Sequence, residues 1–213
     1  MGSGIASGRN ELAMEAATVF IVDDDEDVRN SISILARSVN LAVELFDSGP
    51  EFLDNYPLGR PGCLVRDVRM PGMSGLEVQQ KLNEQDRRIP TIMLTAHAEV
   101  SMATQVMRAG AVDFMQKPFS PHILLERIHE AIQLDADIRR ADQDQSVIAK
   151  LVASLSAREQ EVKRLLAVGH TTKEIAAQLQ ISIKTVDNHR ANVLEKMCVD
   201  NAAQLAHLLA RSS

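Results

Sequence analysis

The feature that most constrains this fold is a repeated alternation of short apolar strands and helical patterns over the first 120 residues. The strand patterns are TVFIV (18–22), LAVELF (41–46), CLVRDV (63–68), IPTIMLTA (89–96) and AVDFMQ (111–116). Between them, apolar residues recur at intervals of three and four, the spacing of a helix that buries one face. Strands separated by helices pair in parallel, and the helices cover both faces of the sheet. We therefore predict an α/β fold with a doubly wound, five-stranded parallel sheet.

Capping residues mark several of the predicted helix ends. A Ser or Thr followed three residues later by Glu forms a capping box, and this spacing occurs at Ser48–Glu51, Ser74–Glu77, Ser156–Glu159 and Thr171–Glu174. Gly110 and Gly169 are placed to end helices in the left-handed conformation. Ser120 and Pro121 have the residue types expected at the start of the helix that follows the fifth strand.

Beyond Pro121 the pattern is helical throughout. Residues 123–155 become increasingly polar, with a loose apolar seam at Leu134, Ile138, Ala141, Gln145, Ile148, Val152 and Leu155. Two interpretations stay open, a coiled-coil contact between two copies and a solvated connector that packs only locally. The last 58 residues contain two short helices joined by a tight turn within a four-helix unit, which suggests a helix-turn-helix.

Composition narrows the possible functions. Aromatic residues supply 3% of the chain and Trp is absent, which argues against an aromatic platform for single-stranded nucleic acid. Residues 1–154 carry 15 basic and 23 acidic side chains, whereas residues 155–213 carry 8 and 6. This mildly basic end permits a nucleic-acid partner. Cys63 and Cys198 lack metal or redox spacing, no apolar run spans a membrane and no signal peptide is evident, so we expect a cytoplasmic protein.

Polar residues follow the strands at their carboxyl ends, where doubly wound sheets bind ligands. These residues are Asp23, Asp24, Asp67, Thr95 and Lys117. Clustered carboxylates repel one another unless a cation lies among them, and Mg²⁺ prefers such oxygen ligands. A carboxylate can attack phosphorus to form an aspartyl phosphate, while a metal ion and a lysine neutralise the developing charge. A threonine hydroxyl can then bind the phosphoryl oxygen, which supplies a switch.

A simpler interpretation places acids at a helix N-terminus because of the helix dipole. It suits Asp25, Glu26 and Asp27, but it does not explain Asp67 or Lys117.

The segments IVDDD, DVRMPGMSG, the Thr of TIMLTA and QKPF together resemble the receiver domain of bacterial response regulators, from about residue 18 to 134. The resemblance implies a flavodoxin-like sheet of order 2-1-3-4-5. It implies that Asp67 is the phosphoacceptor and that Asp23, Asp24, Asp67 and the backbone carbonyl of Arg69 hold Mg²⁺. Thr95 and Lys117 would bind the phosphoryl group, the Lys117–Pro118 bond would be cis, and Phe114 would replace the family's switch aromatic. From the residues alone, Phe114 is a core side chain.

Arg66 departs from the resemblance, because similar sequences usually carry a small, apolar or hydroxyl residue there. Strand alternation points Arg66 away from the face of Asp67. We favour a side chain that reaches solvent at the strand end. The alternative is that it pairs with a pocket acid and alters phosphorylation.

LSAREQEVKRLLAVGHTTKEIAAQLQISIKTVDNHRANVLEKM resembles the LuxR-type helix-turn-helix of the FixJ/NarL regulators. On the helix from Lys184, we predict an inward apolar stripe of Val186, Val193, Leu194 and Met197. A major groove admits such a helix. The predicted DNA-contacting residues are Lys173, Lys184, Asp187, Asn188, His189, Arg190 and Ala191. Asp187 and Glu195 also suit a face turned to water.

The predicted organisation is a flexible tail or tag at residues 1–17, a receiver domain at 18–134, a helical linker at 135–154 and a LuxR-type DNA-binding domain at 155–213. The resemblances imply a response regulator that a sensor histidine kinase phosphorylates, with a homodimer formed on phosphorylation, promoter DNA bound and RNA polymerase as a further partner. It would not be an enzyme, beyond slow self-phosphorylation and self-dephosphorylation. Two alternatives are a Mg²⁺-dependent phosphotransferase or phosphatase and a module that binds DNA constitutively.

Overall fold

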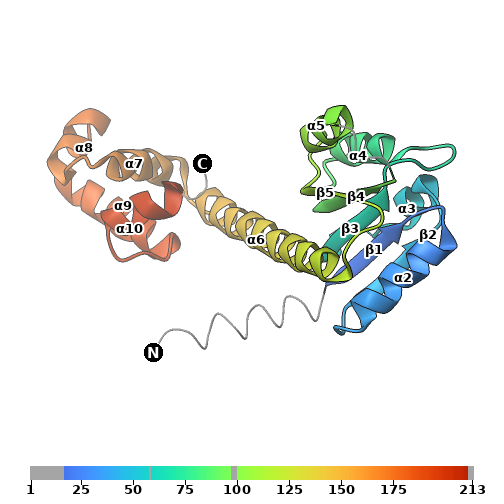
Figure 1. Cartoon of the computed structure of the whole chain (residues 1–213). Helices are drawn as coiled ribbons and strands as arrows, with labels where there is room; N and C mark the ends of the chain where they lie inside the picture. Colours follow the sequence, from blue (N-terminus) through green and yellow to red (C-terminus); the bar gives the residue numbers. More distant parts are fainter. Residues whose placement is uncertain (1–16, 58, 97–99, 211–213) are drawn as a thin grey trace. The chain divides into compact units, whose positions relative to one another are not determined.

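The structure is a computed structural model that describes residues 17–57, 59–96 and 100–210 (Figure 1). The predicted tail or tag therefore lies outside the described residues, apart from Ala17. The chain divides into two compact units between Ile138 and Arg139. None of the helices in the described part combines the length and the apolar character that crossing a membrane requires.

The N-terminal unit is built on a five-stranded parallel sheet, as predicted. Its strands are β1 (Thr18–Val22), β2 (Ala42–Phe46), β3 (Gly62–Asp67), β4 (Thr91–Thr95) and β5 (Asp113–Gln116). They pair in the order β2-β1-β3-β4-β5, and every pair is parallel. The residues of β1, β3 and β4 are all buried, as expected for central strands that helices cover on both faces.

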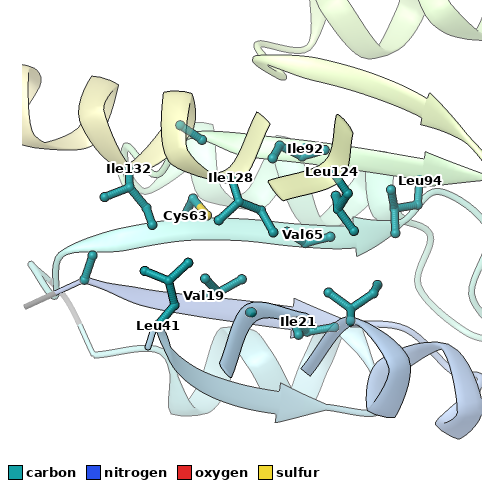
Figure 2. Close-up of a cluster of buried hydrophobic side chains, with 14 residues drawn as sticks. Val19, Ile21, Leu41, Cys63, Val65, Ile92, Leu94, Leu124, Ile128 and Ile132 are labelled. Atoms are coloured by element: carbon teal, nitrogen blue, oxygen red, sulfur yellow. The ribbon is translucent and has the colours of Figure 1, made fainter. Parts of the chain in front are cut away.

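Helices cover the two faces of this sheet with separate apolar layers. The helices are α2 (Glu26–Arg37), α3 (Gly49–Asn55), α4 (Gly75–Glu84), α5 (Val100–Arg108) and α6 (Pro121–Ala153). In Figure 2, Leu124, Ile128 and Ile132 of α6 face sheet residues that include Val19, Cys63 and Val65, and α2 adds Ile32 to this layer. On the opposite face Phe52 of α3 and Val78 of α4 pack with Phe20 and Leu64.

Three of the four predicted capping boxes are present in full, at Ser74–Glu77, Ser156–Glu159 and Thr171–Glu174. The fourth prediction is wrong. Ser48 is the N-cap of α3, but its side chain makes no capping hydrogen bond within the described residues. Pro50 follows it in the first turn and has no N–H, so one of the two usual donors is missing. Glu51 instead accepts a hydrogen bond from the backbone N–H of Asp47.

The last helix of the N-terminal unit continues without a break into the predicted linker, because α6 is 33 residues long. Asp135 is buried and accepts a hydrogen bond from the backbone N–H of Gly62 at 2.9 Å, which fastens α6 to the start of β3. Further along, Ile148 is buried, and Val152 and Leu155 pack in the core of the C-terminal unit. These three positions are therefore occupied within their own unit, whereas Leu134, Ala141 and Gln145 of the same seam are exposed, so both interpretations of the segment stay open.

Four further helices complete the C-terminal unit. They are α7 (Ala157–Val168), α8 (Thr172–Leu179), α9 (Ile183–Lys196) and α10 (Ala202–Ala210). Their shared core includes Val162 of α7, Ile175 of α8 and Val193 of α9. Gly169 ends α7 with a φ of 96°, in the left-handed conformation that was predicted for it.

Glu159 joins two of these helices. Its side chain is buried and accepts hydrogen bonds from Lys196 Nζ at 2.7 Å and from the backbone N–H of Ser156 at 2.8 Å. The hydrogen bond from Lys196, with help from the Ser156 N–H, lowers the pKa of Glu159 to about 2. Glu159 therefore stabilises the start of α7 and its packing on α9 as long as it stays ionised.

We expect Glu159→Gln to destabilise the C-terminal unit at pH 7. Because the folded pKa of Glu159 is depressed, its contribution is present above its ordinary pKa of 4.5 and is lost as pH falls toward about 2. The stability difference between wild type and variant should therefore narrow across this window, as measured by urea denaturation followed through amide NMR signals of residues 155–210. Glu161→Gln is the control, because its ion pair with Arg158 is more exposed. A stability difference between wild type and Glu159→Gln that does not depend on pH would show that the ionised Glu159 side chain is not the source of the stabilisation.

Candidate functional site

The carboxyl ends of the central strands bring the predicted pocket residues to one edge of the sheet. Asp23 directly follows β1, Asp67 ends β3, Thr95 ends β4 and Lys117 directly follows β5. The strand register pairs Val22 with Arg66, Asp67 with Leu94 and Thr95 with Gln116, so the strands end nearly level.

Lys117 bridges two buried carboxylates at this edge. Its Nζ lies 2.6 Å from Asp23 Oδ2 and 2.9 Å from Asp67 Oδ1. The side chains of Asp23 and Asp67 are 2% and 9% exposed, and that of Lys117 is 20% exposed. The close pairing offsets part of the free energy that burying these charges costs.

Backbone donors orient the same two carboxylates. The N–H of Asp25 donates to Asp23 Oδ1 at 3.0 Å, and the N–H of Arg69 donates to Asp67 Oδ2 at 2.8 Å. Arg29 on α2 donates from Nη1 to the backbone carbonyl of Asp23 at 2.6 Å. Sequence reasoning missed Arg29, because its distance from the pocket depends on the turn of α2.

The electrostatics keep the lysine charged. Burial raises the pKa of Asp23, although the hydrogen bond from Lys117 opposes this shift. Burial alone would lower the pKa of Lys117, but the hydrogen bonds to Asp23 and Asp67 outweigh it and raise that pKa. A lysine that stays protonated between two carboxylates provides a fixed positive charge at the pocket.

The other predicted pocket residues lie around this pair. Thr95 is buried, and its hydroxyl donates to Met102 Sδ at 3.9 Å. The Lys117 N–H donates to the carbonyl of Thr95 at 2.7 Å, and the Lys117–Pro118 bond is cis, as expected. Phe114 is half-buried and packs on a cluster that contains Met93 and Val106. Asp24 is exposed, unlike Asp23.

The donor set determines which metal ion the pocket suits. In the described part of the chain, no three His, Cys, Asp or Glu side chains gather as a ready-made metal site. Asp23 and Asp67 are the two carboxylates that lie together, through Lys117. Mg²⁺ is commonly held by one or two carboxylates and keeps several waters. The oxygen donors therefore fit Mg²⁺ in type and number.

An open pocket of about 440 Å³ adjoins Lys117. Pro118 and Phe119 line one side, and Asp27, Val28 and Ser31 of α2 line the other. Sequence reasoning did not single out this surface, although an apolar residue directly after the Lys-Pro pair was a signal for it.

The structure shows neither of the two environments that were predicted for Arg66. The side chain is 0% exposed, so it does not reach solvent. It contacts Gln79 of α4 and not a pocket acid, with Nη2 donating to Gln79 Oε1 at 2.6 Å. Strand alternation correctly predicted its face, but the burial arises because α4 covers this strand end. Burial lowers the pKa of Arg66 to about 9.

In the C-terminal unit, α9 presents the predicted polar face. Val186, Val193 and Met197 are buried and Leu194 is half-buried, which confirms the inward stripe. The predicted contact residues Lys173, Lys184, Asp187, Asn188 and Ala191 are exposed, while His189 and Arg190 are half-buried. Ser182 caps α9 by accepting from the backbone N–H of Thr185.

We expect Lys117→Met to lower the free energy of unfolding at pH 7 by about 3 kcal/mol, because it leaves two buried carboxylates without their cation. The pKa of Asp23, already raised by burial, should rise further. The folded variant then binds a proton more tightly than the unfolded chain. Its stability therefore falls as pH rises from the ordinary Asp23 pKa of 3.8 through the raised pKa in the folded variant.

Urea denaturation at pH 7 and pH 5 tests this expectation. The loss should be smaller at pH 5, and Asp67→Asn in the same chain should recover part of it by removing one of the two charges. An equal loss at both pH values would show that Lys117 acts through packing alone.

The comparisons with known proteins agree with this architecture. Residues 19–129 match the response regulator receiver domain, and residues 153–209 match the bacterial regulatory proteins of the luxR family. The chain is 38% identical to the transcriptional regulatory protein TdiR of Thauera aromatica, covering 93% of this chain and 87% of that protein. It is 40% identical to FixJ of Azorhizobium caulinodans, covering 92% and 91%.

A solved structure of the response regulator StyR covers 92% of this chain and 99% of its own, at 41% identity and a TM-score of 0.83. The matched receiver domain takes in the lysine-bridged carboxylates, and the matched luxR-family segment takes in α9. The chain therefore belongs to the response regulators that join a receiver domain to a LuxR-type DNA-binding domain, and it is a transcriptional regulator of the FixJ type.

Proposed function

We propose that Asp67 is the phosphoacceptor and that a sensor histidine kinase phosphorylates it in the presence of Mg²⁺. The observation that carries this proposal is the single lysine that bridges Asp23 and Asp67. A carboxylate held in this way is oriented and lies beside a positive charge, which is what attack on phosphorus requires.

The residues of the pocket have distinct parts in the transfer. An oxygen of Asp67 forms the new bond to phosphorus while the bond to the donor breaks. Lys117 Nζ, now 2.9 Å from Asp67 Oδ1, then donates to a phosphoryl oxygen. Asp23 holds Lys117 in reach. Bound Mg²⁺, with Asp23, Asp24, Asp67 and the Arg69 carbonyl as proposed ligands, would neutralise charge on the phosphoryl oxygens.

Thr95 and Phe114 are the proposed route from the pocket to the surface. The hydroxyl of Thr95 donates to a sulfur atom, a weak acceptor, and a phosphoryl oxygen accepts far more strongly. Thr95 ends the strand that pairs with β5, and Phe114 lies on β5. A shift of Thr95 toward the phosphoryl group therefore changes the space that Phe114 can occupy.

The output is proposed to be a homodimer that binds promoter DNA and engages RNA polymerase. Two helix-turn-helix units fit paired half-sites. Within each unit, we propose that Asn188 and Asp187 contact base edges, that Ala191 contacts a thymine methyl, and that Lys184 and Arg190 contact phosphates. Lys173, in the first turn of α8, and His189 would contact the DNA backbone. Because the target is chromosomal DNA, we place the protein in the cytoplasm.

The proposed domains are a receiver at 18–134, a helical linker at 135–154 and a DNA-binding domain at 155–213. The linker is a continuation of α6. Phosphorylation acts as a population shift, so its effect is limited by the difference in dimer stability between the two states.

Beryllofluoride with Mg²⁺, or acetyl phosphate, should increase dimerisation and promoter affinity of the wild type and leave Asp67→Asn unchanged, because the variant lacks the attacking carboxylate. Analytical ultracentrifugation and a DNA-binding titration measure the two effects. Asp54→Asn is a matched control, an exposed acid on α3. Equal promoter binding by treated and untreated wild type would favour constitutive DNA binding. Turnover of small phosphoesters would favour an enzyme.

We expect Asn188→Ala to relax base preference at one position of the site by about 1–3 kcal/mol. Lys184→Ala should weaken binding to all sequences. It should also reduce the slope of log affinity against log salt concentration by about one, because one phosphate contact is lost. Fluorescence anisotropy with a set of single-base operator variants at several salt concentrations separates the two effects. Lys150→Ala, an exposed lysine on α6, serves as the control. If Asn188→Ala weakened every operator equally, its proposed base contact would be excluded.

A further inference from the structure

Arg66 is a charged side chain in an apolar layer. It is 0% exposed and lies on β3, directly before Asp67 in the chain. Its register partners on the neighbouring strands are Val22 of β1 and Met93 of β4, both fully buried. Its helix contact is to Gln79 of α4, a neutral amide. Burying a cation without a charged partner is costly.

The hydrogen bonds of this guanidinium are incomplete. Nη2 donates to Gln79 Oε1 at 2.6 Å. Nε and Nη1 are buried and have no hydrogen-bond partner among the described residues. A buried N–H group without an acceptor loses the hydrogen bond to water that it has in the unfolded chain. The packing of α4 on β3 therefore leaves Arg66 in an unfavourable environment.

The same contact continues as a chain of hydrogen bonds across α4. Gln79 Nε2 donates to Asn83 Oδ1 at 3.1 Å, and Asn83 Nδ2 donates to the carbonyl of Ala109 at 2.9 Å, just beyond the end of α5. This chain links the strand that carries Asp67 to α4 and to the end of α5.

The apolar cluster around Phe114 is built from the elements that this chain joins. Leu76 of α4 and Val106 of α5 pack in it with Val68 and Met93. The position of α4 therefore bears on the space around Phe114.

We propose that Arg66 is a positioning residue for α4, which it holds by one hydrogen bond while its unpartnered donors favour arrangements in which α4 has moved. A displacement that admits water or a carbonyl oxygen to Nε and Nη1 removes their penalty. An apolar residue at this position would gain nothing from the same displacement. Arg66 thus lowers the free energy needed to shift α4.

The consequence for signalling rests on the proposed function. If phosphorylation at Asp67 moves α4, Arg66 reduces the part of the switching free energy that the phosphoryl group must supply. Only the difference between the two states matters for this equilibrium. Arg66 contributes such a difference because its hydrogen bonds are incomplete in one of the two states.

Hydrogen–deuterium exchange of the full chain, without any phosphoryl group, tests the local claim. Arg66→Met replaces the cation by an apolar side chain of similar length. We expect the backbone amides of residues 75–84 to exchange about tenfold more slowly, because α4 opens less often. Amides of α2, on the other face of the sheet, should change much less. Leu64→Met, on the same face of β3, is the matched control and should not slow exchange in α4.

Gln79→Glu provides an independent variant with the cation retained. It gives Arg66 a charged partner in the same place, so exchange in α4 should slow as it does in Arg66→Met. Unchanged or faster exchange in Arg66→Met, or equal slowing in Leu64→Met, would overturn the proposal.

A beryllofluoride titration with Mg²⁺, followed by dimer formation, tests the signalling consequence. Arg66→Met should need several-fold more beryllofluoride than wild type for half-maximal dimerisation. An identical midpoint in the two proteins would remove the link to switching. A wild type that does not respond would count against the proposed function, while the exchange results would still decide the positioning role.

Discussion

The ion pairs of Lys117 with Asp23 and Asp67 are the interaction on which the N-terminal unit's chemistry depends. Two carboxylates at one edge of a parallel sheet repel each other, and the lysine that follows the last strand forms an ion pair with each of them. The sheet order makes this possible, because β1 and β3 are neighbours and β5 lies two strands from β3. Backbone N–H groups of Asp25 and Arg69 complete the hydrogen bonds of the carboxylates, so the pocket is formed before any phosphoryl group arrives.

Two successive residues of β3 are charged, but they lie in different environments on the two faces of the sheet. Asp67 lies at the strand end, where a lysine and a backbone N–H share its two oxygens. Arg66, one residue earlier, points into an apolar layer and has a single neutral acceptor. The first arrangement satisfies its charges and the second does not. A polar group that is kept in a costly environment is expected where function, more than stability, has shaped the packing.

Much of this organisation could be predicted from the sequence, because it depends on short-range patterns. The alternation of strands and helices predicted the parallel sheet. The positions of Asp23, Asp67 and Lys117 at the ends of their strands predicted that these side chains lie together. Two of the failures share a cause, which is dependence on packing between elements. The burial of Arg66 depends on the position of α4, and the contact of Arg29 with Asp23 depends on the first turn of α2. The capping box predicted at Ser48 is absent for a local reason that the sequence shows, since Pro50 lacks a backbone N–H that could donate to the Ser48 side chain.

Gly75 fixes how the phosphoacceptor strand and α4 are connected. Its N–H donates to the carbonyl of Val68, and a Cβ at this position would lie 2.3 Å from the carbonyl oxygen of Asp67. Main chain therefore rests against main chain here, with no side chain between the two segments to absorb a displacement. The end of β3 and the start of α4 are therefore held together at this one contact, and a displacement of the rest of α4 has to pivot about it. Any larger residue at this position would separate the end of β3 from the start of α4, next to the proposed phosphoacceptor.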